Sequence, residues 1–111
     1  LKLTALKAFN PDALARASVM KAALVEYYMS MGQWPLKTTD VGMGQPGDFA
    51  GGPVASINLE PEGVIAIAPK PEVALGARIR LVPQVKPTGM IEWTCRPTGY
   101  AAAERLPGCK P

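Results

Sequence analysis

Apolar residues spaced alternately four and three apart predict one long helix near the start of the chain. Asn10 is typical of a helix N-cap, Pro11 of a first helical position and Gly32 of the residue just past a helix end. Between them one apolar stripe recurs with the period of a helix, at Ala13, Ala17, Met20, Leu24, Tyr27 and Met31. The pattern predicts a helix over 11–31. Residues 1–10 are either a helical lead-in or an artificial remnant of cloning.

The periodicity ends after the helix. Residues 32–53 form the next segment, in which the stretch 36–53 alone carries five glycines and two prolines. Glycine and proline interrupt regular structure, so this segment is predicted to be a long irregular loop. Long loops in compact domains are often functional.

A different pattern, typical of half-buried strands, begins at Val54. Apolar and polar residues alternate in four short stretches; Ile79 and Leu81, for example, alternate with Arg78 and Arg80. The four stretches are 54–60, 63–68, 77–82 and 89–95. Together they predict a sheet over 54–94.

The connections between these strands are rich in proline and glycine and too short for crossover helices. Consecutive strands should therefore pair antiparallel, as a meander. An apolar helix stripe and an apolar sheet face bury each other when they pack together. We expect one α+β domain over 1–111, with a long N-terminal helix on a four-stranded antiparallel meander sheet and a C-terminal loop over 95–109.

Composition argues against catalysis. The chain has no histidine, which removes the commonest general base and the commonest metal ligand. The loop carboxylates lack the spacing of a calcium site; they are Asp40, Asp48, Glu60 and Glu62. The net charge is only +3, and the basic residues are scattered along the chain. We therefore predict no catalytic residues, no metal and no cofactor.

The two cysteines, Cys95 and Cys109, both lie in the last seventeen residues of the chain. Their spacing is not that of a CxxC redox or metal motif. They are either buried free thiols or a structural disulfide, and the disulfide is favoured. It would close a loop of about fifteen residues and stabilise the domain by about 3 kcal/mol. A disulfide also indicates an exported, oxidising location.

An ordered set of short motifs resembles the type IV pilins of Gram-negative bacteria, of the IVa-like kind. The motifs are EYYMSMGQWP at the end of the helix, the Gly-rich loop, GVIAIA, ARIRLVP, GMIEWTC and LPGC. In that family a tryptophan commonly stands two residues before the first cysteine, as Trp93 does here, and Leu-Pro close before the second. The resemblance runs from about residue 13 to residue 111.

The resemblance implies that the helix is the C-terminal half of a pilin spine, and that loops 33–53 and 95–109 meet neighbouring molecules. The family's N-terminal hydrophobic helix, with its processing site, N-methylation and glutamate, is missing from this sequence, so we expect a soluble truncation. The implied partners are other pilin subunits in a helical homopolymer, the pilus assembly machinery and, through the missing helix, the inner membrane. The implied location is the fimbrium at the cell surface, with an inner-membrane and periplasmic pool before assembly.

The function implied is that of a structural pilus subunit in adhesion, twitching motility or a related role. A minor pilin that binds DNA for uptake is one alternative, and a type II secretion pseudopilin is another. Weak DNA contacts would come from five basic residues in loops or near the C-terminus, namely Lys70, Lys86, Arg96, Arg105 and Lys110. The same residues also fit ordinary solubility charges. Arg78 and Arg80 are predicted to form cross-strand pairs with Glu92.

Overall fold

The structure, a computed structural model, describes residues 2–72 and 76–99 of the chain. It begins with a single α-helix, α1 (Lys2–Met31). Two short 3-10 helices follow, η1 (Thr38–Val41) and η2 (Pro46–Phe49). The remaining elements are β1 (Val54–Glu60), the turn η3 (Pro61–Gly63), β2 (Val64–Pro69), β3 (Arg78–Val85) and β4 (Ile91–Thr98).

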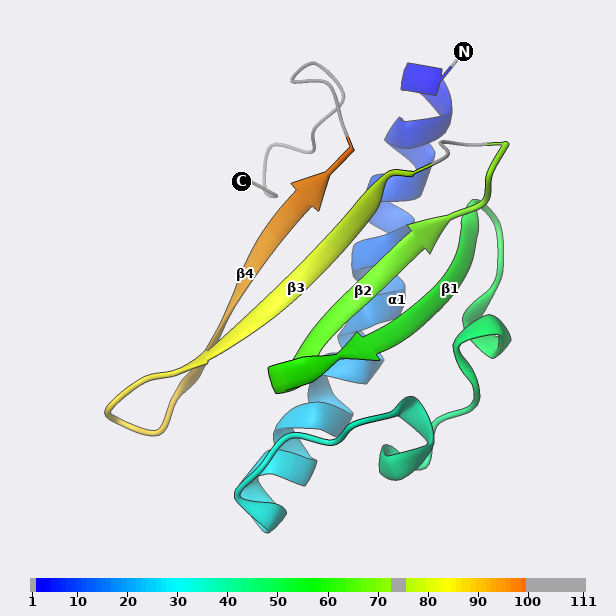
Figure 1. The fold of residues 1–111 in the computed structure, drawn as a ribbon. Helices are drawn as coiled ribbons and strands as arrows, with labels where there is room; N and C mark the ends of the chain where they lie inside the picture. Colours follow the sequence, from blue (N-terminus) through cyan, green and yellow to red (C-terminus); the bar gives the residue numbers. More distant parts are fainter. Residues whose placement is uncertain (1, 73–75, 100–111) are drawn as a thin grey trace.

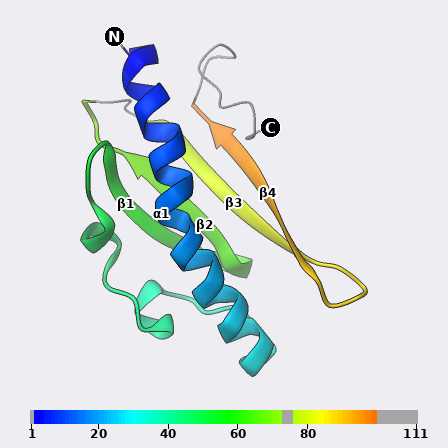
Figure 2. The ribbon, with the colours of Figure 1, turned by 180° about the vertical axis from the view of Figure 1, so that it is seen from behind.

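The four strands form one antiparallel sheet in the order β1-β2-β3-β4, and α1 lies across one of its faces (Figure 1). Seen from behind, α1 runs in front of the sheet, and no other described element covers its outer side (Figure 2). This confirms the α+β prediction of a long helix on an antiparallel meander. The helix is 30 residues long, about 45 Å at 1.5 Å per residue, and the molecule's longest dimension is 44 Å.

The helix begins before the predicted start at Pro11, so residues 2–10 are the helical lead-in that the sequence left open. The helix begins at Lys2 and passes through Pro11, with Asp12 in its interior. Proline removes one backbone donor, but residues 2–9 consist mostly of good helix formers, such as leucine, lysine and alanine, and these extend the helix past it. Asp12 accepts a hydrogen bond from Arg16 one turn later, Nε to Oδ2 at 2.6 Å.

The core lies between α1 and the sheet. Four residues of the predicted helix stripe are fully buried there: Ala13, Ala17, Met20 and Leu24. They pack against the inner-face residues of the strands, chiefly Ile57, Ile65, Ile67, Ile79 and Leu81. The stripe does not stay buried to its end, because Met31 is 58% exposed. The last turn of α1 extends beyond the sheet (Figure 2), which leaves Met31 largely uncovered.

Strand β4 runs on to Thr98, so the segment predicted as a loop from Cys95 begins as a strand. Pro97 lies inside β4. It is tolerated because β4 is an edge strand, where a missing backbone donor can face away from the ladder. The rest of the predicted 95–109 loop, from residue 100, lies outside the described residues, as does Cys109. No helix within the described part of the chain is both long enough and apolar enough to cross a lipid bilayer.

Candidate functional site

The side of α1 that faces away from the sheet is apolar and exposed. Ala15, Val19, Ala22 and Met29 lie at helical spacing on this side, with the exposed Glu26 between Ala22 and Met29, and we call these four apolar residues the outer helix face. Val19 is 64% exposed and Met29 is 60% exposed. A helix that is apolar on two opposite sides has more to bury than its own sheet can cover. The outer helix face is therefore a candidate contact surface for another molecule.

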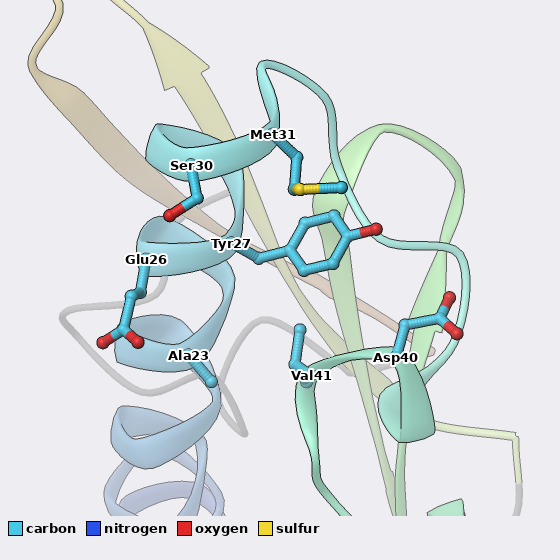
Figure 3. A pocket seen from close by; sticks show the side chains of 7 residues that line it. All are labelled: Ala23, Glu26, Tyr27, Ser30, Met31, Asp40 and Val41. Atoms are coloured by element: carbon cyan, nitrogen blue, oxygen red, sulfur yellow. The ribbon is translucent and has the colours of Figure 1, made fainter.

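A hollow of about 370 Å³ lies beside the last turns of α1, where the loop carrying η1 folds back toward the helix. Figure 3 shows five side chains of α1 and two of η1 around it. They are Ala23, Glu26, Tyr27, Ser30, Met31, Asp40 and Val41. Two of these are carboxylates and none is basic. The Tyr27 ring and the Met31 thioether add polarisable surface between the two acids.

The two carboxylates are held differently. Asp40 Oδ2 accepts the backbone N–H groups of Leu36 and Lys37, each at 3.2 Å, so the turn of η1 fixes this side chain. Glu26 is exposed and has no hydrogen bond or ion pair within the described part of the chain. Asp40 is thus held by its own loop, whereas no described neighbour holds Glu26.

A stack of aromatic rings fixes where the loop leaves the helix. Tyr28 and Trp34 stack with ring centroids 4.4 Å apart, and Trp34 meets Trp93 of β4 edge-on at 6.3 Å. Trp34 also lies against Gly63, where a Cβ atom would come within 2.5 Å of the indole ring. The motif tryptophans therefore join the start of the loop to the sheet. Neither Tyr27 nor Tyr28 is fully buried.

The outer face of the sheet carries a group of arginines. Arg78 and Arg80 of β3 point to the same face, because residues two apart in a strand do so, and Arg96 of β4 is the register partner of Arg80. We call these three residues the arginine patch. Glu60 of β1 supplies the carboxylate that pairs with Arg80, at 2.7 Å from Nε to Oε1 and 3.1 Å from Nη2 to Oε2. This hydrogen-bonded pair lowers the pKa of Glu60 and raises that of Arg80.

The predicted cross-strand pairing of Arg78 and Arg80 with Glu92 is wrong. Glu92 stands opposite Gln84 in the register and pairs instead with Lys86, at 3.3 Å from Nζ to Oε1. Arg80 reaches across β2 to Glu60, a contact between strands that are not neighbours and that alternation in a sequence cannot reveal. Arg96 is exposed and has no partner within residues 2–72 and 76–99.

The basic residues proposed for DNA contacts do not gather on one surface. Lys86 lies at the far end of the β3–β4 hairpin, in its ion pair with Glu92. Lys70 follows β2, and its backbone N–H bonds the Pro53 carbonyl. Arg96 belongs to the arginine patch, whereas Arg105 and Lys110 lie outside the described residues. The sequence reasoning therefore missed the patch, whose signal was the alternation Arg78-Ile79-Arg80 beside Arg96.

Cys95 lies on the inner face of β4, opposite Leu81, and packs against the core. Its predicted partner, Cys109, lies outside the described residues, so the disulfide stays a prediction.

Asp40 and Asp48 both accept backbone N–H groups in their own 3-10 turns. Among the described residues, no three acidic, cysteine or histidine side chains are grouped to hold a metal ion.

Comparison with known proteins agrees with this architecture. Residues 10–110 match the Pilin family, described as a bacterial filament. A search of curated proteins finds no match. The family match covers the helix from Asn10 onward, the loop and the whole sheet, in the order that the structure shows. The chain therefore belongs to the Pilin family of bacterial filament proteins.

Proposed function

We propose that this chain is the globular part of a type IV pilus subunit and that it acts by self-assembly, not by catalysis. Family membership establishes a structural pilus subunit in a surface filament. The finer role, in surface adhesion or twitching motility, belongs to the proposal. So do the inner-membrane and periplasmic pool before assembly and the contacts with assembly machinery.

The observation that carries the proposal is the outer helix face. Its residues Ala15 and Ala22 are small, so a second helix can approach closely, and Val19 and Met29 offer apolar side chains to interdigitate. Each Å² of apolar surface that is buried between two molecules favours their association by about 25 cal/mol. In a filament made of copies of one chain, the neighbouring helix is the natural occupant of this face.

The test uses the protein expressed from its complete gene in cells that lack the wild-type copy. We expect Val19→Asp or Met29→Asp to lower the amount of sheared filaments seen by electron microscopy at least tenfold, because each introduces a charge into a contact that must lose water. Met90→Asp is the matched control. Met90 is 65% exposed, like Met29, but lies in the β3–β4 turn.

Filament amounts that survive both Val19→Asp and Met29→Asp would contradict assembly through this face. Thermal unfolding of the isolated domains checks that the variants fold, since neither residue belongs to the core.

The same strains separate the alternatives. Loss of DNA uptake with filaments intact would favour a DNA-binding minor pilin. Loss of protein secretion without surface filaments would favour a type II pseudopilin.

A further inference from the structure

The interior strand β2 carries small residues on the outer face of the sheet, the face turned away from α1. One of them, Ala66, is the register partner of Arg80 on β3. Arg80 reaches across β2 to Glu60 and bonds both carboxylate oxygens, Nε to Oε1 and Nη2 to Oε2. This ion pair lies over Ala66, which is nearly buried. The space above Ala66 is therefore filled by side chains of the chain itself.

One step along β2, the space above Ala68 is open. Ala68 shares the outer face with Ala66, because residues two apart in a strand do so. Ser56 of β1 is the register partner of Ala68, and Arg78 comes two residues before Arg80 on β3. An open hollow of about 390 Å³ lies here, and Ser56, Ala68 and Arg78 all line it. Figure 1 looks onto this end of the sheet, where β1 begins, β2 ends and β3 begins.

Arg78 brings a guanidinium to this hollow without an acid to pair with it. Its Nη1 donates to the backbone carbonyl of Ala77 at 2.8 Å. Within residues 2–72 and 76–99 it forms no ion pair, and both oxygens of Glu60 already bond Arg80. The edge of Arg78 formed by Nε and Nη2 is therefore left for another group. Arg80 holds the Glu60 carboxylate by this same edge, in the two-point geometry typical of arginine and carboxylate.

The remaining walls of the hollow are those of a small-molecule site. Its volume falls within the range of about 300–1,000 Å³ typical of ligand pockets, which are mostly apolar with a few polar groups. Apart from Arg78 and Ser56, the described lining consists of alanine, proline and glycine. It holds no acidic side chain that would repel an anion. The Ser56 hydroxyl has no hydrogen bond within the described part of the chain, so it can bond a ligand hydroxyl.

We propose that this hollow binds a small hydroxylated carboxylate of the sugar-acid class. The ligand carboxylate takes the place on Arg78 that Glu60 takes on Arg80, and a ligand hydroxyl bonds Ser56. The body of the ligand lies over Ala68, where no side chain of the described residues fills the space. The site does not depend on assembly through the outer helix face, because α1 lies on the opposite face of the sheet (Figure 2).

Titration of the 111-residue chain with sodium glucuronate, followed by amide NMR, tests the proposal. Sodium chloride keeps the sodium concentration constant, so that screening does not change during the titration. We expect saturable shifts at the amides of 55–56, 68–69 and 77–78. Glucose has the same ring without the carboxylate. It should leave these amides in place, because its hydroxyls cannot replace the charge-assisted pair with Arg78.

Two variants separate the charge from the space. Arg78→Gln should weaken glucuronate binding by about tenfold or more, because it removes the charged two-point contact. Ala68→Leu keeps the guanidinium but fills the hollow, and it should cause a similar loss. Arg96→Gln is the matched control, since it removes the same charge from the same face outside the described lining. It should leave binding within about twofold of wild type, because a charge outside the hollow acts through screened solvent. The amide spectrum of each variant shows whether it is folded.

Several results would overturn the inference. Glucuronate could cause no saturable shifts, or glucose could cause equal ones. Equal losses in Arg78→Gln and Arg96→Gln would mean that only the overall charge attracts the ligand. Inorganic phosphate that displaces glucuronate at equal concentration would show a site for any small anion, and it would overturn the assignment to a carboxylate. Undiminished binding in Ala68→Leu would place the ligand outside the hollow.

Discussion

Arg80 and Glu60 form a two-point ion pair that spans the sheet from β3 to β1, over the intervening strand β2. The residue beside Arg80 on β2 is Ala66, whose short side chain leaves room for the pair to pass. Ala66 is nearly buried although it lies on the outer face, outside the apolar core cluster. The pair therefore covers part of the outer face and ties three strands together.

This pair makes stability depend on pH in a defined direction. The hydrogen bond from Arg80 holds the folded-state pKa of Glu60 below its ordinary value of 4.5. The pair therefore stabilises the fold fully at pH values above the unfolded-state pKa of Glu60. This stabilisation is lost as pH falls from about 4.5 through the lower, folded-state pKa of Glu60. We expect Glu60→Gln to lower the free energy of unfolding at pH 7 by about 1 kcal/mol at most, because both side chains are about one-third exposed.

Urea unfolding of wild type and Glu60→Gln across pH 2–7 measures the effect, and the difference should shrink toward the acid end. Glu92→Gln is the matched control, because its pair with Lys86 is longer and more exposed. An equal loss in both variants at pH 7 would contradict the special role of Glu60.

Arg96→Thr should stabilise the isolated domain. Replacing one of two opposed arginines removes a like-charge pair, worth roughly 0.2–1 kcal/mol in a cross-strand position. Thermal and urea unfolding at low salt should show the gain, and added salt should reduce it. A destabilised Arg96→Thr domain would mean that Arg96 supports the fold.

Gly63→Ala should destabilise the domain more than Gly89→Ala. Both glycines have positive φ angles, 78° and 88°, so alanine is strained at each by roughly 1–2 kcal/mol. Only at Gly63 would the new methyl group also collide with the Trp34 ring, because the space around Gly89 is open. Displacing Trp34 should also reduce the near-ultraviolet circular dichroism of the stacked rings. Equal unfolding free energies for the two variants would show that Trp34 moves aside at no cost.

Cys95 and Cys109 are expected to be joined. Mass measurement after alkylation, with and without prior reduction, decides this directly, and reduction should lower the free energy of unfolding by about 3 kcal/mol. Cys95→Ser combined with Cys109→Ser separates loss of the bridge from effects of the reductant. Two thiols that alkylate in the unreduced protein would exclude the bridge, and with it the argument for an oxidising location.

The sequence by itself determined the class of fold and most of the core. Alternation placed Ile79 and Leu81 on one face of a strand, and the helical stripe identified Ala13, Ala17, Met20 and Leu24, because these patterns are local and repeat with the geometry of the backbone. It misplaced two ends. Pro11 reads as a helix start from its own chemistry, whereas the helix formers before it extend α1 through it. β4 runs past the predicted loop start at Cys95, because its pairing with β3 continues to Thr98.

Only the tertiary structure decided which charges meet. Glu60 and Arg80 are twenty residues apart and become partners because two hairpins lay β1 and β3 on either side of β2. The register, not the spacing, sets Arg96 against Arg80, and the fold of the loop brings Val41 to the last turns of α1, near Tyr27. Secondary structure follows from periodic local preferences, whereas charge pairing and hollows depend on contacts between segments far apart in sequence, and a pattern read along one strand carries no information about them.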